Sequence, residues 1–179
     1  MIVIGNMKAL NMQYDELWFV MRSMDWFYKK KAKSISTNRL VYSNEIIQSN
    51  YQLLMQPNVH IVDELAPSHE LYTFYLSHKD RRTWGDEVFY MDYVPMFIHE
   101  MSTQEDSRDK LNELYRLDKM GKTILLVCAC QEERICHRSI LAGLLYGVGC
   151  NVKSSFGTNI SQYGVYYEMY KNKRENISE

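Results

Sequence analysis

Residues Thr123–Leu145, TILLVCACQEERICHRSILAGLL, decide the fold class of this chain. The first part, Thr123–Cys128, is apolar throughout, which is typical of a central parallel strand that is covered on both faces. The second part, Ser139–Tyr146, carries its leucines and isoleucine on one stripe at helical spacing, so it is predicted to be an amphipathic helix that ends at Gly147. The stretch therefore predicts a strand, a loop and a helix in succession.

Strands and helices alternate along the rest of the chain. Apolar runs predict strands at residues 1–5, 39–42, 59–62 and 151–154. Helical spacing predicts helices over Tyr14–Lys31, 44–55, 68–76, 86–101 and 102–120. This alternation predicts a single three-layer, Rossmann-like α/β domain with a mainly parallel sheet.

Three helix ends carry specific signals. Ser68 precedes a predicted helix and can accept a hydrogen bond from its first free amides, as an N-cap does. Ser102 and Glu105 form the S-x-x-E pattern of a capping box, which predicts that another helix begins at Ser102. Gly121 is expected to end that helix.

We expect the α/β domain to span residues 1–160. Within it, residues 11–60 are interpreted as a helical insertion or a family-variable part. Residues 161–179 are interpreted as a C-terminal tail that is first Tyr-rich and then charged.

The composition limits the functional class. The 179 residues carry a formal net charge of −1, which leaves a nucleic-acid partner open but does not favour one. No apolar run reaches the roughly 18 residues of a membrane span, and residues 1–10 lack the sections of a signal peptide. The cysteines, three of them between Cys128 and Cys136, do not resemble a secreted disulfide framework. We therefore expect a cytoplasmic protein without a membrane partner, whose composition hints at a phage or a low-GC bacterium.

The loop between the predicted strand and helix concentrates the reactive side chains. Ligands of parallel sheets bind at the carboxyl ends of the strands, where Cys128 lies. The free amides of a helix start attract anions, and Arg134 and Arg138 can hold a phosphate or carboxylate through paired hydrogen bonds. A cysteine near a helix start, such as Cys136, has a lowered pKa, and the neighbouring His137 can act as a base.

Several interpretations of this loop are open. In the first, the cysteines are small core residues and the Cys-His-Arg sequence only caps the helix. In the second, the loop binds an anion or a nucleotide, with or without turnover. The third is thiol catalysis in the manner of tyrosine phosphatases, because Cys128 and Arg134 have the C-x5-R spacing. Glu132 and Glu133 weigh against it, since they would repel a phosphate.

A metal site formed by Cys128, Cys130, Cys136 and His137 is the fourth interpretation. Zinc requires four ligands that converge at tetrahedral angles, whereas positions along a strand alternate between its two faces. The C-x-C-x5-C-H spacing also matches no common zinc motif. We therefore predict neither a metal nor a cofactor.

The same residues resemble the signature of the DUF488 family, whose function is not established. Its members carry a hydrophobic strand that ends in Cys and, eight residues later, a Cys-His-Arg that opens a helix with Ala-x-x-Leu. In this chain the matching positions are Cys128, Cys136, His137, Arg138, Ala142 and Leu145. Residues 65–75 (LAPSHELYTFY) and 1–10 (MIVIGNMKAL) resemble two further segments of the family. Cys130 departs from the pattern, because many relatives have an acidic residue there.

The resemblance implies one pocket at the carboxyl ends of three strands. It would bring together Asn6, Met7 and Lys8, then Pro67 and Ser68, and the loop from Cys128 to Arg138. Ser68 is then either an N-cap or a ligand contact. Trp84 and Tyr93 are expected to pack in the core rather than to stack on a base.

We therefore expect a protein that binds a small anionic, nucleotide-like ligand, with or without turnover. Arg134 and Arg138 would hold the anion, and the further binding residues would be Asn6, Lys8 and Ser68. The alternative is a cysteine-dependent enzyme that acts on a nucleotide or a nucleic-acid base, with catalytic residues Cys128, Cys136 and His137. A further alternative is an interaction module that uses the Tyr-rich tail.

Overall fold

In the computed structural model, which describes residues 1–22 and 52–177, the chain forms an α/β domain around a parallel sheet. Within these residues the sheet contains β1 (Ile2–Asn6), β2 (Glu16–Phe19), β3 (Val59–Ile61), β4 (Ile124–Cys128) and β5 (Val152–Ser154). Every pairing is parallel, and the order across the sheet is β3-β2-β4-β1-β5. The predicted fold class, a three-layer Rossmann-like domain, is confirmed.

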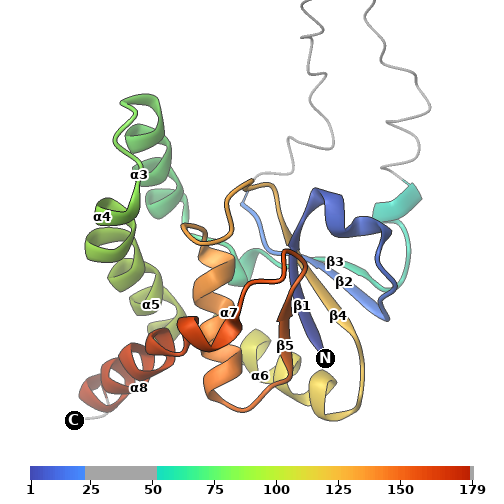
Figure 1. Ribbon diagram of the computed structural model, residues 1–179. Coiled ribbons are helices and arrows are strands. Elements are labelled where there is room, and N and C mark those ends of the chain that lie inside the picture. Colours follow the sequence, from blue (N-terminus) through green and yellow to red (C-terminus); the bar gives the residue numbers. More distant parts are fainter. Residues whose placement is uncertain (23–51, 178–179) are drawn as a thin grey trace, which may run out of the picture.

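The helices lie in the connections between the strands and after the last strand (Figure 1). The short ones are η1 (Met7–Asn11), η2 (Asp63–Leu65), α4 (Asp86–Val88), η3 (Phe89–Tyr93) and η4 (Ile160–Tyr163). The longer ones are α3 (His69–Asp80), α5 (Val94–Thr103), α6 (Glu105–Lys119), α7 (His137–Gly147) and α8 (Val165–Ile177). The helix predicted over 86–101 is thus α4, a π-helical turn (η3) and α5 in succession.

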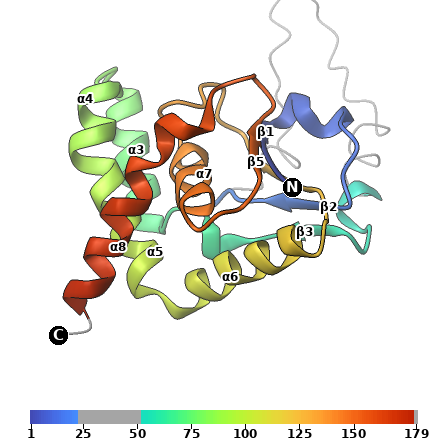
Figure 2. The same cartoon turned by 60° about the horizontal axis from the view of Figure 1, so that its bottom comes forward.

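Two apolar layers, one on each face of the sheet, form the core. β4 lies in the middle of the sheet, and its side chains alternate between the layers. Ile124 and Leu126 join the layer that contains side chains of α5, α6 and α7, whereas Leu125 and Val127 join the layer beside η1. Figures 1 and 2 show the longer helices gathered on one side of the sheet and η1 on the other. The predicted central strand, covered on both faces, is confirmed.

The prediction of a helix over Tyr14–Lys31 is wrong for the first part of this range. This part of the chain is β2, which pairs with β3 and β4. The apolar run Leu17–Met21 is buried at every position, as expected of a parallel strand with both faces covered, whereas an amphipathic helix would keep a polar outer face. Because β2 lies within residues 11–60, that range contributes a strand to the sheet. The elements predicted over residues 23–51 lie outside the described residues.

Two of the three predicted helix ends are confirmed, and one is wrong. The amide of Leu71 donates a 3.1 Å hydrogen bond to Oγ of Ser68, so Ser68 is the N-cap of α3. Gly121 follows α6 with a φ of +79°, a left-handed conformation that glycine adopts without strain. Ser102, however, lies inside α5, where its hydroxyl donates to the carbonyl of His99. The buried stripe of α5 extends through Met101 and Ser102, which carries that helix past the expected start at Ser102 to Thr103.

The C-terminal segment packs against the domain, where α8 lies against α5 and α7 (Figure 2). Tyr163 and Tyr166 are buried in the larger apolar layer. A Cβ atom at Gly143 of α7 would lie 2.1 Å from the carbonyl oxygen of Tyr163, so the missing side chain allows η4 to approach this closely.

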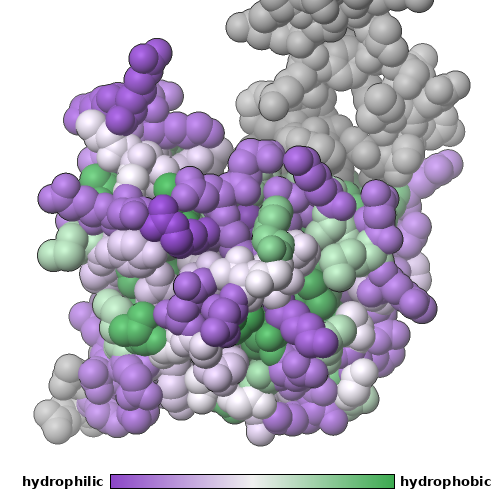
Figure 3. All heavy atoms as spheres, viewed as in Figure 1, coloured by the Kyte–Doolittle hydropathy of each residue, from purple (hydrophilic) through white to green (hydrophobic). Residues whose placement is uncertain are grey.

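The surface is mainly polar on the face drawn in Figure 3, where hydrophobic side chains form small separate groups. Among the described helices, none has the length and apolar character needed to cross a membrane.

Candidate functional site: a cysteine cluster in an aromatic cavity

A cavity of about 400 Å³ lies where β4 ends. The end of β4, the loop after it and the start of α7 form one wall. The residues that follow β2, Pro67 and side chains of α3 also line it, and Trp84 and Tyr93 complete the lining. The cavity is therefore at the carboxyl edge of the sheet, where ligands of parallel sheets bind.

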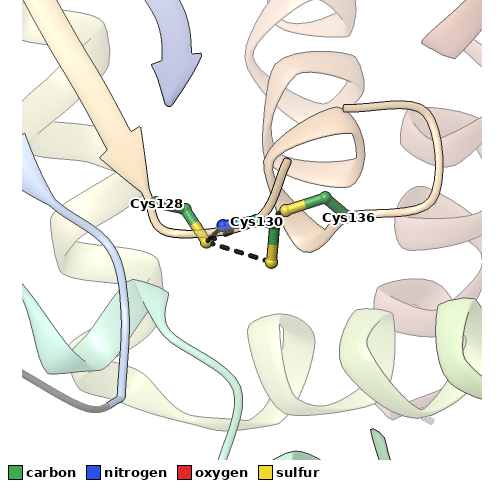
Figure 4. Close-up of side chains that lie close together, drawn as sticks. All are labelled: Cys128, Cys130 and Cys136. Carbon is green, nitrogen blue, oxygen red and sulfur yellow. Dashed lines mark hydrogen bonds between the residues drawn. The ribbon is translucent and has the colours of Figure 1, made fainter. Parts of the chain in front are cut away.

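Three cysteines converge at this wall (Figure 4). Cys128 is the last residue of β4, Cys130 lies in the loop, and Cys136 precedes the first residue of α7 and points back toward the other two. The sulfur of Cys128 is 3.4 Å from that of Cys130 and 3.9 Å from that of Cys136. Of the three, Cys128 and Cys136 are buried and Cys130 is partly exposed. All three line the cavity.

The position of Cys130 corrects the argument that strand alternation separates the cysteines. Cys128 and Cys130 are two positions apart, so alternation would place them on the same face. In addition, β4 ends at Cys128, and the turn that follows allows the amide of Cys130 to approach the sulfur of Cys128 at 3.5 Å. The turn after β4 therefore brings the sulfurs of Cys128 and Cys130 together, which strand alternation alone did not predict.

Arg138 lies behind the cluster, on the first turn of α7, and its side chain is 0% exposed. Its Nε donates to the sulfur of Cys136 at 3.4 Å, and its Nη2 donates to the carbonyl oxygen of Cys130 at 2.9 Å. Its Nη1 has no hydrogen-bond partner among the described residues. The guanidinium is thus held against a sulfur atom, and it does not line the cavity.

His137 contributes its ring to the cavity wall. Its Nε2 is bonded to the carbonyl oxygen of Val20, which follows β2. A carbonyl oxygen only accepts, so Nε2 carries a proton. Nδ1, the other ring nitrogen, lies 3.7 Å from the sulfur of Cys136. The hydrogen bond to Val20 therefore leaves Nδ1 available to exchange a proton with that sulfur.

The surroundings of Cys136 favour its thiolate form. Burial by itself would raise the pKa of its thiol, but hydrogen bonds from Cys128 and Cys130 and the charge of Arg138 outweigh burial and hold the pKa well below its usual range. A hydrogen bond with Cys130 acts to lower the pKa of Cys128, yet the bond to Cys136 and burial raise it to about 12. The pKa of Cys130 is also raised, by its bonds to the other two sulfurs and by burial. The cluster therefore favours a thiolate at Cys136 over one at Cys128 or Cys130.

Aromatic rings line the same cavity as the thiols. The ring of Trp84 stands edge-on to Tyr75 at 4.8 Å and to Tyr93 at 5.2 Å, measured between ring centres. Trp84 and Tyr93 also pack in the larger apolar layer, so their expected role in the core is confirmed, and both line the cavity as well. Tyr93 belongs to the π-helical turn η3, a feature that is frequent at functional sites. Its pKa is raised by burial and by the nearby cysteines.

The residues predicted to bind an anion are not brought together at this cavity. Asn6 ends β1, and its Oδ1 accepts a hydrogen bond from the amide of Lys8, which is exposed. Ser68 caps α3, and its own amide donates to Oε2 of Glu100 at 3.0 Å. Neither Asn6, Lys8 nor Ser68 lines the cavity. The structure does place Cys128, Cys136 and His137 together, all three in the cavity wall.

Arg134 is turned to the surface. Its Nη1 forms an ion pair with Asp86 at 2.6 Å, and its Nη2 one with Glu132 at 3.3 Å. Glu133 is buried on the other side of the loop, where it accepts hydrogen bonds from the hydroxyls of Ser154 and Tyr163. The C-x5-R spacing therefore does not produce a phosphatase loop here, because the arginine of such a loop would have to face the bound phosphate.

Two cationic side chains line the cavity that the sequence argument did not select. Arg22 follows β2 and donates through Nε to the carbonyl of Pro67 at 2.8 Å. Lys79 lies on α3 with its Nζ 5.5 Å from the centre of the Tyr75 ring. No local sequence signal identifies Arg22. The pattern predicts a helix there, so the position of Arg22 beyond the end of β2 is not predicted. Lys79 lies one helical turn beyond Tyr75, which could have identified this face of α3.

The fold and the site define an α/β domain with a thiol cluster where its central strand ends. Residues 29–148 match the family model DUF488-N3a, described as the active DUF488-N3 subclade. Since the match covers more than half of the chain, the protein belongs to the DUF488 family, as its Cys-x7-Cys-His-Arg motif indicated. No curated protein and no solved structure matches the chain.

Proposed function

We propose that this protein is a cysteine-dependent enzyme that acts on a flat, base-like ring, either a nucleotide or a nucleic-acid base. Cys136 is its nucleophile, and His137 exchanges a proton with it. The observation that carries the proposal is the hydrogen bond from the fully buried Arg138 to the sulfur of Cys136 at the wall of the cavity.

The charge of Arg138 explains why Cys136 is the nucleophile. A guanidinium stays protonated in proteins, and a buried charge requires an opposite one. In the described part of the chain, no carboxylate lies within ion-pair distance of Arg138, and its Nε contacts the sulfur of Cys136 instead. The thiolate form of Cys136 supplies the opposite charge. A thiolate is the reactive form of cysteine.

His137 is suited to proton transfer at the same sulfur. With Nε2 donating to Val20, Nδ1 can take the proton of the Cys136 thiol, and the pair then becomes a thiolate and an imidazolium. The same proton can be returned to a substrate atom from Nδ1. A base oriented by a third group is the general arrangement of an activated nucleophile.

The cavity lining indicates the class of substrate. The partly exposed ring of Tyr75 offers a surface on which a base can stack, and Trp84 and Tyr93 add apolar lining to the same cavity. Arg22 and Lys79 stand on the α3 side of the same cavity, where they can attract a phosphate of a bound nucleotide. A nucleotide-like molecule therefore fits both the apolar and the cationic parts of the lining.

Geometry favours this proposal over anion binding without turnover. Both arginines of the expected anion site have protein partners: Arg134 contacts Asp86, and Arg138 contacts Cys136. The description of the matched family model as an active subclade agrees with turnover.

The test is conversion of a substrate by the reduced, full-length protein. The protein is treated with EDTA, incubated with a mixture of the common nucleosides and nucleotides, and the mixture is analysed by mass spectrometry. We expect one component to change in mass with the wild type and with Cys150→Ser, and none to change with Cys136→Ser. Cys150 is a matched control because it is buried and does not line this cavity. Equal conversion by Cys136→Ser would exclude Cys136 as the nucleophile.

A further inference from the structure

We propose that Cys128, Cys130 and Cys136 together bind one thiophilic divalent cation, such as Zn²⁺, whose fourth coordination position faces the cavity. This inference goes beyond the proposed enzyme and does not depend on it. Because the ion would occupy the sulfur of Cys136, it would shield this cysteine from reaction. Metal binding at this site would therefore inhibit any reaction of the Cys136 sulfur.

The spacing of the sulfurs fits such an ion. Zinc binds cysteine sulfur at about 2.3 Å in tetrahedral geometry, which places any two bound sulfurs about 3.8 Å apart. The sulfur of Cys128 is 3.4 Å from Cys130 and 3.9 Å from Cys136, and all three sulfurs lie within 4.8 Å of one another. The two measured separations lie on either side of the expected value. Figure 4 shows that the three side chains come from both sides of the loop toward a common point.

The surroundings compensate the charge of the complex. A divalent ion bound by three thiolates has a net charge of −1, and the buried Arg138 supplies one positive charge through its bond to the sulfur of Cys136. The amide of Cys130 approaches the sulfur of Cys128 at 3.5 Å. Contacts of this kind from outside the ligand set orient the ligands and stabilise metal sites.

The fourth position is open to the cavity. All three cysteines line it. Nδ1 of His137 lies 3.7 Å from the sulfur of Cys136, but it does not lie within reach of all three sulfurs and is not part of the group. Three protein ligands with an exchangeable fourth position are typical of zinc sites that are accessible to small molecules. Thiophilic ions are favoured over Mg²⁺ or Ca²⁺, which prefer oxygen ligands.

The test measures zinc binding and the protection of Cys136 by zinc. The reduced, full-length protein is titrated with Zn²⁺ in competition with a chromophoric chelator, and Cys136 is labelled with iodoacetamide with and without zinc. We expect one zinc ion per chain, release of protons on binding, and labelling of Cys136 that zinc prevents and EDTA restores. Co²⁺ serves as a second probe, because its thiolate complexes absorb in the near ultraviolet.

Cys130→Ser is the decisive variant, since Cys130 is a ligand in the proposed site. Loss of a contact outside the ligand set lowers metal affinity about 10- to 100-fold, so we expect loss of this ligand to lower it by about 100-fold or more. Zinc should then no longer protect Cys136. Cys150→Ser should bind zinc as the wild type does. Cys128→Ser, which removes another of the proposed ligands, should lower zinc affinity as Cys130→Ser does. Thermal melting of each variant separates loss of a ligand from loss of the fold.

Two results would overturn the proposal: wild-type protein that retains no zinc against the chelator, or a folded Cys130→Ser protein with wild-type zinc affinity. Neither result bears on the enzyme, because its conversion assay uses EDTA-treated protein. A protein that binds zinc but converts no nucleotide would contradict the proposed enzyme and support the metal site.

Discussion

Nη2 of Arg138 donates a 2.9 Å hydrogen bond to the carbonyl oxygen of Cys130, which joins the first turn of α7 to the turn that follows β4. The same guanidinium reaches the sulfur of Cys136 through Nε. A single buried side chain therefore fixes the shape of the loop and supplies the charge that stabilises a thiolate.

The first prediction concerns Arg138→Met, which removes the charge and keeps an apolar stem. Removing one partner of a buried charge pair costs about 3–5 kcal/mol, so we expect the free energy of unfolding near neutral pH to fall by about this amount. Chemical denaturation measures it. Cys136→Ser alone should also destabilise the protein, because it leaves the guanidinium of Arg138 without its anion.

The double variant Arg138→Met/Cys136→Ser is the control for this pair. Since it removes both charges, its loss of stability should be smaller than the sum of the two single losses. Additive losses would mean that Cys136 carries no charge in the folded protein.

The second prediction is a difference in pH dependence between two buried cysteines. The pKa of Cys136 is lowered, so its thiolate persists as the pH falls below the usual thiol value of about 8.5. Its iodoacetamide labelling should therefore decline less between about pH 8 and about pH 6 than the labelling of a thiol whose pKa is not lowered. The pKa of Cys150 is raised to about 11 by burial and by the charge of Asp118, so its labelling should fall about tenfold per pH unit over the same range.

Peptide mapping by mass spectrometry of EDTA-treated protein gives both profiles in one sample, with Cys150 as the internal reference. A parallel decline of the two rates with falling pH would contradict the charge assigned to Cys136.

Gly143→Ala is the third prediction, and it tests the docking of the C-terminal segment. The added Cβ atom would lie 2.1 Å from the carbonyl oxygen of Tyr163, and a backbone atom can move only together with η4. Overpacking of this kind typically costs about 1–3 kcal/mol, which a lowered melting temperature would reveal. Gly85→Ala is the matched control, since a Cβ at Gly85 meets no atom within 4 Å. Equal melting temperatures for the two variants would contradict the close packing of α7 and η4.

Ser68→Ala, the fourth prediction, decides between the two roles that the sequence allowed for this residue. The hydroxyl of Ser68 accepts from the amide of Leu71 and does not line the cavity. We expect a loss of about 1 kcal/mol in stability, as for other N-cap serines, and no change in nucleotide conversion. Steady-state kinetics of the folded variant make the comparison. A stable variant with impaired conversion would show that Ser68 contacts the ligand.

The parts of the fold that the sequence predicted depend on local patterns. β4 and α7 follow from an apolar run and a single helical stripe, and the cap at Ser68 and the stop at Gly121 follow from side-chain chemistry within one turn of the chain. β2 was missed because Leu17–Met21 is short and entirely apolar. Such a run fits a buried strand or a buried helix equally well until its partners β3 and β4 are known.

The candidate site could be predicted only in part, for the same reason. Cys128, Cys136 and His137 belong to one local motif, and the structure keeps them together. The motif does not determine the direction of an arginine side chain. Arg134 and Arg138 both contact other residues of the protein. Another part of the cavity wall comes from α3 and η3, more than 30 residues earlier in the chain, so only the tertiary structure reveals that Tyr75 and the thiols line one cavity.

The last prediction concerns that wall. Tyr75 lies on α3, half-buried, with its ring edge-on to Trp84 at 4.8 Å. Stacking of a base on an aromatic side chain is worth about 1–3 kcal/mol, so Tyr75→Leu should raise the KM for the converted nucleotide about 5- to 150-fold. Tyr75→Phe keeps the ring and should stay close to the wild type. Because both variants lose the hydroxyl, their difference isolates the ring. Equal KM values for Tyr75→Leu and Tyr75→Phe, in proteins of equal melting temperature, would show that no base stacks on this side chain.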